Sequence, residues 1–377
     1  MKHLIQRPLP DESICSALIR TSLKVGLPIG VITPAVAGGR KWYPSFFQCG
    51  PLEALADATR MPVAELLLLH SFFPYASAFF DAPLYERSVK IALSTGPTAR
   101  SQAPVTQGVS DHCPHRRFCR QCVSNDIRRW GESYWHRSHN LPGVRICSEH
   151  LIPLVETTLR TTGSGTWRYT LPAQVAGRAI ASQTISTFDV DFAVASVSAL
   201  TQRAPTPPSR THYRHALIHR GLLSSERQVN PRALAAWGLQ GAGASIDKLG
   251  LRASDKNLKW MAQMVRPHAG VAVVPLKHLI FRTLISRADT SSQAILDHIP
   301  SGPSGKEIEQ LDARYCKDLQ DVCRKAIRGG ERISVRRALE AAGCWSAYRR
   351  ATAKFPKTGS ALLALRRSEA SVRKITA

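Results

Sequence analysis

Four potential metal ligands constrain this 377-residue chain more than any other feature of its sequence. They form two pairs, Cys119-x2-Cys122 and Cys147-x2-His150, which 24 residues separate. Each pair presents two soft or borderline ligands from one tight turn, and two such turns complete the corners of a tetrahedral zinc site. Because four protein ligands leave no open position, the spacing predicts one structural zinc ion in a module spanning residues 111–160.

Further candidate ligands surround the two pairs. The chain has nine cysteines, and in a reducing compartment the three between positions 113 and 122 favour metal over disulfides. A second metal site stays open as an alternative, with the candidate ligands Cys113, His115, His136 and His139. The pair His139-Asn140 also suggests an HNH-type nuclease, but no acidic cluster suited to two-metal hydrolysis accompanies it. We therefore expect no catalytic residues and no enzyme.

The chain is strongly basic, with 51 Lys and Arg against 27 Asp and Glu and a net charge of +24. Such a charge predicts a polyanionic partner, with a passive basic surface as the alternative. The charge is concentrated near the C-terminus, where residues 314–377 carry 16 Lys or Arg and five Asp or Glu. The sequence therefore predicts that the C-terminal region binds DNA.

Two short helices are predicted inside this basic region. Residues 333–343 form the first, which ends at Gly343, and residues 346–354 form the second. Such a pair is typical of a helix-turn-helix, whose second helix enters a groove of DNA, and a solvated basic face is the alternative. The side chains expected to contact DNA are Arg336, Arg337, Tyr348, Arg349, Arg350 and Lys354.

The remaining sequence predicts a mainly α fold. Polar stretches with proline or glycine at residues 94–111, 203–210 and 300–306 indicate linkers. We expect four regions: a partner-facing, helix-turn-helix-like block at residues 1–110, the zinc-finger module at 111–160, a helical region at 161–300, and the helix-turn-helix-like DNA-binding region at 301–377.

The N-terminal block is expected to begin with a helix that Asp11 caps. Later, residues 52–60 and 62–70 predict two short helices with a break at Met61-Pro62. This pair fits a helix-turn-helix or an ordinary helical hairpin, and its apolar second helix leaves protein as an alternative partner to DNA. Residues 1–10 lack the apolar run of a signal peptide, and no stretch approaches the roughly 20 apolar residues of a membrane helix. We therefore expect a cytoplasmic, nucleoid-associated protein with no membrane partner.

The region around the metal ligands resembles the TniQ/TnsD family, the target-selection proteins of certain bacterial transposons. Besides the four metal ligands, the family pattern is matched here by Phe118, Tyr134, Trp135, His139, Leu141, Pro142, Gly143, Val144 and Leu154. The N-terminus is similar to the family's opening at Arg7, Pro8, Pro10, Glu12, Ser13, Ser16 and Arg20. Looser similarity to the longer TnsD-like members covers Trp260, residues 264–266 and residues 275–280.

Two departures from the family pattern concern the metal. Arg120 stands where the family usually has a proline after the first cysteine. Some members carry a second cysteine pair soon after the last histidine ligand, and residues 156–169 of this chain contain no cysteine. We therefore expect one zinc ion and not two.

The resemblance implies a targeting adaptor without chemistry of its own. Such a protein recognises the insertion site and recruits the transposon's AAA+ ATPase regulator, a TnsC/TniB-like protein, which engages the transposase. Some members of the family bind target DNA directly, and others dock on a CRISPR Cascade complex with its guide RNA. The basic C-terminal region favours direct DNA binding. A zinc-containing DNA-binding transcription regulator is the alternative from another class.

Overall fold

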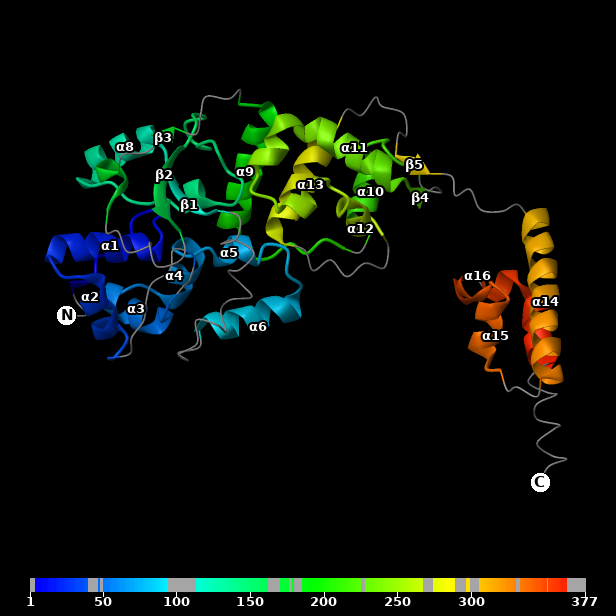
Figure 1. The fold of residues 1–377 in the computed structure, drawn as a ribbon. Coiled ribbons are helices and arrows are strands. Elements are labelled where there is room, and N and C mark those ends of the chain that lie inside the picture. Colours follow the sequence, from blue (N-terminus) through cyan, green and yellow to red (C-terminus); the bar gives the residue numbers. More distant parts are fainter. Residues whose placement is uncertain are drawn as a thin grey trace. The chain divides into compact units, whose positions relative to one another are not determined.

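The fold, shown as a computed structural model in Figure 1, divides into two compact units, Met1–His298 and Ile299–Ala377. The described residues are mainly helical, as the sequence predicts. The expected linker at residues 94–111 lies outside them, and residues 203–209 have neither helix nor strand. The structure describes residues 4–39, 47, 50–93, 113–161, 170–175, 178–179, 185–209, 211–224, 228–266, 274–288, 296–298, 305–329, 333–350 and 352–364.

Helices form the N-terminal part of the first unit. Their bounds are α1 (Ile14–Val25), α2 (Ile29–Val36), α3 (Leu52–Thr59), α4 (Val63–Leu69), α5 (Phe73–Ala76) and α6 (Ala82–Leu93). Two of them, α3 and α4, are the short helices that the sequence predicts, and Arg60 between them adopts a left-handed conformation. Their apolar sides are buried in the core at Leu55, Leu66 and Leu67.

A three-stranded antiparallel sheet follows, which the sequence analysis missed. Its order is β1–β2–β3; Phe118 pairs with Val155, and Val155 pairs in turn with Ala179. The elements of this part are β1 (His115–Phe118), α8 (Arg120–Trp130), η2 (Ser138–Asn140), β2 (Val155–Arg160), η3 (Pro172–Gln174) and β3 (Arg178–Ala179). The strands span only two to six residues, too few for a clear alternating pattern.

The rest of the first unit is helical, apart from one short antiparallel strand pair. The bounds are α9 (Thr187–Thr201), α10 (His212–His219), β4 (Gln228–Val229), α11 (Pro231–Ala242), η4 (Gly243–Lys248), η5 (Ala253–Asp255), α12 (Met261–Met264), α13 (Pro275–Arg287) and β5 (Asp297–His298). Because α9 packs against both α5 and α13, it joins the N-terminal helices to the later ones. One hydrophobic core accordingly runs through the whole unit.

Gly143 lies where the segment before β2 approaches α9 closely. Its φ is 73°, and a Cβ there would lie 3.0 Å from both the carbonyl oxygen of Leu249 and a ring carbon of Phe192 on α9. Any larger residue would strain the backbone and push the segment away from α9. The positive φ and the close approach together require a glycine at this position of the chain.

A buried ion pair fixes the start of α1. Glu12 is fully buried and accepts two hydrogen bonds from Arg20, at 2.8 Å from Nε and 2.9 Å from Nη2. Ser16, on the same side of the helix, donates to Glu12 at 2.7 Å and accepts from the amide of Trp135 at 3.0 Å. The bidentate pair therefore satisfies both buried charges and ties α1 to the segment before η2.

The expected cap of α1 was wrong by two residues. The hydroxyl of Ser13, and not the carboxylate of Asp11, accepts from the amide of Ser16 at 3.2 Å. Asp11 instead pairs through its backbone with the segment before η2, because its carbonyl oxygen accepts from the amide of Arg137 at 2.9 Å. This pairing turns the carboxylate of Asp11 away from the helix.

Among the described residues, no single helix is long and apolar enough to cross a membrane. Only α1 and α2 taken together pass a test of length and composition, with a bend of 115° between them. Apolar residues of both helices are buried in the protein core, including Leu18, Ile19 and Ile29.

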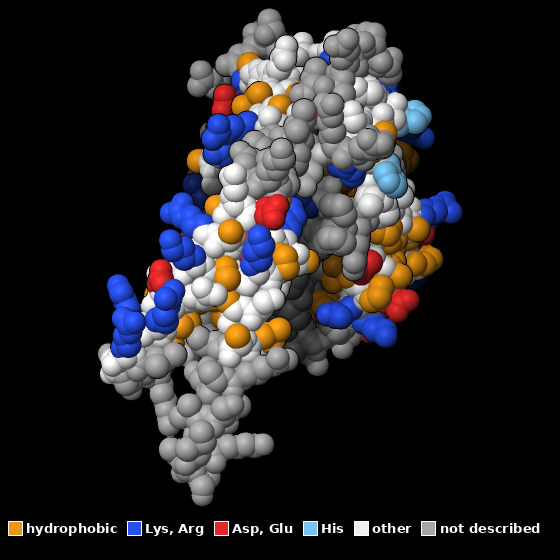
Figure 2. All heavy atoms as spheres, turned by 90° about the vertical axis from the view of Figure 1, so that its right-hand side faces the viewer, with side chains coloured by type: hydrophobic (Ala, Val, Ile, Leu, Met, Phe, Trp, Pro, Cys, Tyr) orange, Lys and Arg blue, Asp and Glu red, His pale blue; other side chains and the backbone are white. Residues whose placement is uncertain are grey.

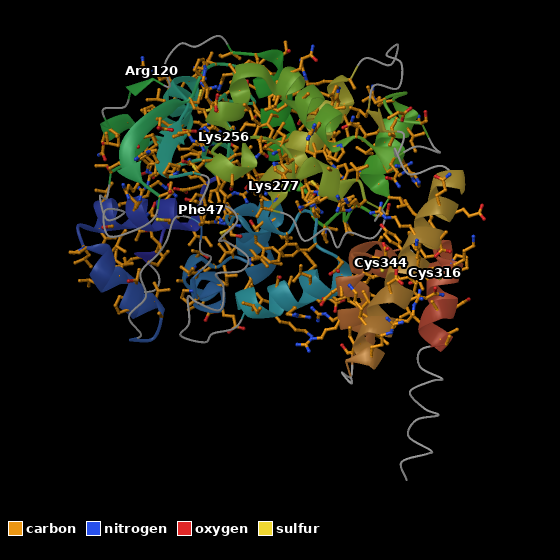
Figure 3. The ribbon with its side chains drawn as sticks, turned by 45° about the vertical axis from the view of Figure 1, so that its right-hand side comes forward. Phe47, Arg120, Lys256, Lys277, Cys316 and Cys344 are labelled. Atoms are coloured by element: carbon orange, nitrogen blue, oxygen red, sulfur yellow. The ribbon has the colours of Figure 1, made fainter. Side chains whose placement is uncertain are left out.

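The second unit has a small core of its own. Its helices are α14 (Gly305–Arg328), α15 (Val335–Ala341), α16 (Trp345–Arg350) and η6 (Thr352–Lys354), and residues 356–364 are also helical. Gly343, with φ 67°, lies in the turn between α15 and α16, as the sequence predicts. The carboxylate of Asp312 accepts from the amides of Lys357 and Thr358 at 2.8 and 2.9 Å, which anchors the last helix on α14. Cys316 and Cys344 both belong to this unit (Figure 3).

Replacing Arg20 by methionine should destabilise the first unit by about 3–5 kcal/mol at neutral pH, because it leaves the buried carboxylate of Glu12 without its positively charged partner. Urea unfolding of parent and variant measures this difference. The matched control is Glu132→Gln, since Glu132 also accepts from Arg20 but is 30% exposed. A loss as small for Arg20→Met as for the control would contradict the role given to the ion pair.

Candidate metal centre

Two turns bring the predicted ligands together. Cys119 precedes α8, and Cys122 lies in the first turn of that helix. In the second turn, the amide of Cys147 donates to the carbonyl oxygen of Ile152 at 2.9 Å, and the amide of His150 lies 3.5 Å from the sulfur of Cys147. Hydrogen bonds to sulfur are typical of turns that present a thiolate to a metal, since they stabilise its negative charge.

The four ligand atoms have the spacing of a tetrahedral site. All lie within 4.8 Å of one another. Nδ1 of His150 is 3.5, 3.3 and 3.5 Å from the sulfurs of Cys119, Cys122 and Cys147, and the last two sulfurs are 3.7 Å apart. Metal–ligand bonds of about 2.3 Å to sulfur and 2.0–2.1 Å to nitrogen give tetrahedral edges of roughly 3.8 and 3.5 Å. The arrangement is therefore compatible with one structural metal ion.

The thiols themselves point to a cation. Hydrogen bonds from Cys122 and Cys147 lower the pKa of Cys119, and contacts with Cys119 raise the pKa values of Cys122 and Cys147. Three thiolates this close repel one another, so a cation at their centre is what allows all three to ionise.

Two side chains outside the set of four contact the ligands. Asn125, one turn after Cys122 on α8, lies 3.2 Å from Nε2 of His150. His139 directs its Nε2 towards the sulfur of Cys122 at 3.5 Å, and burial lowers the pKa of His139 to about 3. When a metal holds Cys122 as a thiolate, a neutral His139 would carry its one N–H on Nε2 and donate it to that sulfur.

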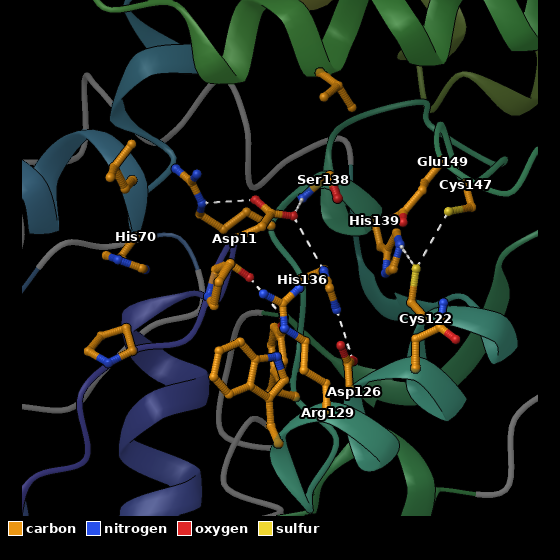
Figure 4. A pocket seen from close by; sticks show the side chains of 18 of the residues that line it. Asp11, His70, Cys122, Asp126, Arg129, His136, Ser138, His139, Cys147 and Glu149 are labelled. Carbon is orange, nitrogen blue, oxygen red and sulfur yellow. Dashed lines mark hydrogen bonds and ion pairs between the residues drawn. The ribbon is translucent and has the colours of Figure 1, made fainter.

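A cluster of buried and partly buried charges lies beside the ligands and is shown in Figure 4. His136 is 3.0 Å from the carboxylate of Asp126 on α8 and 3.6 Å from that of Asp11, which also lies 3.3 Å from Nε of Arg137. Burial disfavours the charged form of His136, but Asp11 and Asp126 outweigh it and raise its pKa to about 9. The charged imidazole therefore joins the N-terminal segment to the metal-binding helix.

The further candidate ligands all have other partners. Arg117 donates to the sulfur of Cys113 at 2.8 Å, and Glu156 lies 3.7 Å from His115. His136 is held by its two carboxylates and His139 by Cys122. In the part of the chain that the structure describes, one group of residues has the geometry of a metal site, and it is the predicted set of four.

Asn140 has a structural role. It is fully buried; its side-chain oxygen accepts from the amide of Arg117 at 2.8 Å, and its amide group donates to the carbonyl oxygens of Arg117 and His136 at 3.0 and 2.8 Å. These bonds hold η2 against β1. Nothing in the geometry around His139-Asn140 favours the nuclease hypothesis.

The metal ligands and the N-terminal ion pair fall within one family match. Residues 4–154 match the model of the TniQ family. The chain carries a TniQ domain. No curated protein matches the chain. The match to TniQ ends at Leu154, directly before β2, so the later helices of the first unit and the whole second unit lie beyond it.

The side chains predicted to contact DNA lie in the second unit, outside the TniQ domain. Those of Arg337, Arg349 and Lys354 are exposed, whereas Arg336, also exposed, pairs with Glu340 at 2.8 Å on the same helix. Tyr348 is partly buried against the small core, and the side chain of Arg350 is outside the described part.

Sequence reasoning missed the residues that support the ligands, namely Asn125, Asp126, the charged form of His136, and Asp11. One signal was available, because Asp126 follows Cys122 by four residues and so lies on the same side of α8. The partners of Asp126 come from distant segments, and no local pattern marks them.

Replacing Cys122 by serine should abolish metal binding and cooperative unfolding of the first unit, because a structural metal contributes about 10–16 kcal/mol in small domains. Elemental analysis and thermal melting measure the two effects. Cys316→Ser is the control, since Cys316 lies in the second unit and should leave the metal content unchanged. A parent protein that is folded and free of metal would contradict the site.

Replacing His136 by glutamine should change how stability depends on pH. The folded-state pKa of about 9 exceeds the ordinary value of 6.5, so the stabilisation from charged His136 is fully present below pH 6.5 and lost as the pH rises through 9. The difference in unfolding free energy between parent and variant should therefore shrink by on the order of 3 kcal/mol across that window. Urea unfolding at several pH values measures it, and a constant difference would contradict the ion pairs.

Proposed function

We propose that this protein is a target-site selection adaptor of a bacterial transposon. It binds target DNA and recruits the AAA+ ATPase regulator of the transposase, a TnsC/TniB-like protein, and it performs no reaction of its own. The observation that carries the proposal is the TniQ match over residues 4–154, which contains all four candidate metal ligands. Binding to DNA would place the protein at the nucleoid.

We assign the metal as a single structural zinc ion. Three thiolates and one imidazole form a donor set that zinc takes in closed structural sites. The ligands Cys119, Cys122, Cys147 and His150 hold the start of α8 against the second turn. In this assignment the ion stabilises a zinc finger within the TniQ domain and contacts neither DNA nor the ATPase.

DNA binding is assigned to the second unit, with α15 and α16 as a helix-turn-helix. The support is electrostatic, because residues 314–377 carry a net charge of +11 and DNA presents a dense row of phosphates. On the surface shown in Figure 2, Lys and Arg side chains are far more abundant than Asp and Glu. A protein that docks only on a Cascade complex has less need of this charge, which favours direct DNA recognition.

The ion pair on α15 separates two neighbouring arginines by function. Arg336 is neutralised by Glu340, whereas Arg337 and Arg349 have no carboxylate partner among the described residues. Arg337 and Arg349 are therefore the better phosphate contacts. This assignment refines the six residues expected from the sequence.

The double variant Arg337→Gln/Arg349→Gln should bind target DNA about tenfold more weakly, because two phosphate contacts are lost. The slope of log affinity against log salt should fall by about two, one for each contact. Fluorescence anisotropy over a salt series measures both quantities. Arg336→Gln is the matched control and should have a clearly smaller effect than Arg337→Gln. Equal losses for these two single variants would show that α15 does not face DNA as proposed.

A further inference from the structure

The first unit has a groove of about 1030 Å³ beside the metal ligands. Its lining comes from α4, α8 and α9, from the opening segment at residues 7–11, and from the turn at residues 147–150. Figure 4 shows the interior, with Asp11, His136 and Cys122 from three different segments around it. The volume reaches the upper end of the range for small-molecule pockets, roughly 300–1,000 Å³, so a length of polypeptide can fit.

The charged groups inside the groove are paired with one another. His136 contacts Asp126 at 3.0 Å, and Arg137 faces Asp11 at 3.3 Å. Arg137 also donates to the carbonyl oxygen of Ser71 at 2.6 Å. Because these charges neutralise one another, they do not require a counter-ion from outside. A ligand of the groove would therefore be recognised by the side chains of its walls and rim.

Apolar side chains from two helices line the groove. Leu69 at the end of α4 is 48% exposed, and Val197 of α9 lines the same groove. α9 has apolar side chains on its buried side, such as Phe192, and on its outer side, such as Val194, which is 52% exposed. Exposed apolar side chains such as Val194 are suited to packing against a partner.

Two arginines at the end of α8 form a basic rim. Arg128 and Arg129 are exposed, and neither has a carboxylate partner in the described ranges. The guanidinium of Arg129 lies 4.9 Å from the ring centroid of Trp130, which is itself 39% exposed. By contrast, Arg7 across the groove is held by Glu65 at 3.6 Å. The unpaired positive charge is thus concentrated beside an aromatic ring at one edge.

We propose that this groove docks an extended segment of a partner protein that carries an apolar side chain followed by carboxylates. The apolar side chain packs against Leu69 and Val197, and the carboxylates contact Arg128 and Arg129. An apolar anchor supplies the affinity of such a contact, and opposite charges fix the direction of the segment.

A nucleic acid fits this groove poorly. Duplex DNA carries about one negative charge per 1.7 Å, and the lining includes the carboxylates of Glu65 and Glu149. The unpaired arginines lie on one rim only, and Leu69 would face phosphates instead of an apolar partner. The groove therefore differs from the second unit, whose cations suit a polyanion.

This inference rests on the proposed function, because the ATPase regulator is then the partner that supplies the segment. The probe is the purified AAA+ ATPase regulator of the same transposon, and its affinity for the full-length protein is measured by calorimetry. Leu69→Gln and Arg128→Gln/Arg129→Gln should each weaken binding about tenfold. The loss in the arginine variant should shrink as salt rises, since its contacts are exposed charges.

The matched controls lie on α11, away from the groove. Leu239→Gln removes a leucine that is 38% exposed, and Arg232→Gln removes an exposed arginine. Both should change the affinity by less than about twofold, as expected for surface substitutions outside an interface. Metal content and thermal melting check that each variant is folded, and Leu69→Ala serves as a second, smaller change at the anchor position.

Each outcome decides the matter. Loss of ATPase binding in the groove variants, with DNA affinity unchanged, supports the docking site. Unchanged ATPase binding in those variants overturns the docking site and leaves the adaptor function standing. No binding of the ATPase by the parent protein overturns the adaptor function and the docking site with it. A parallel loss of DNA affinity in the groove variants would identify nucleic acid as the occupant and overturn docking of a protein segment.

Discussion

Two ligand turns meet with four ligand atoms within 4.8 Å of one another, an arrangement compatible with one metal ion, and the path of the TniQ domain depends on this meeting. One turn starts α8 at Cys119 and the other ends at His150, so their closure sets the path of the chain between them. That path contacts the opening segment through Arg137 and approaches α9 at Gly143. A metal that holds the two turns therefore also fixes parts of the protein that contain no ligand.

Buried charges fix the same region a second time. Asp11 and Glu12 are neighbours in the chain, but Asp11 faces His136 while Glu12 faces Arg20. This stretch is a turn, in which Asp11 has a φ of 58° and the amide of Glu12 donates to the carbonyl oxygen of Leu9 at 2.9 Å. The turn lets two neighbouring carboxylates reach two different clusters. A shift of this segment by one residue would put Pro10 or Ser13 in place of one carboxylate and leave a buried cation unpaired, at a cost of several kcal/mol. The ion pairs thus fix how the opening segment aligns with the segment that contains His136 and Arg137.

The sequence predicts the ligands better than their surroundings, for a physical reason. Cys119 and Cys122 come from one turn, so their spacing alone indicates that they are metal ligands. The mainly α class is likewise predicted from local sequence patterns. The contact of His136 with Asp11 joins residues far apart in the chain, and the strands beside the ligands are too short for a periodic pattern. The cap of α1 was misplaced because tertiary pairing outweighed local preference at Asp11. Features set by neighbouring residues can therefore be predicted from this sequence, and contacts between distant segments cannot.

The two units differ in how their charges are paired, and this difference supports the proposal that each unit binds a different kind of partner. In the first unit, the charges inside the groove pair with one another, and the exposed groups around them include Leu69 and Trp130 beside the two arginines of the rim. Such a surface selects a partner by shape and by a few charges at its rim. In the second unit, cations such as Arg337 lack carboxylate partners among the described residues. Their positive electrostatic potential can therefore attract a polyanion. Under the proposed function, DNA would be held through charge and the protein partner through packing, and the two contacts would use different residues.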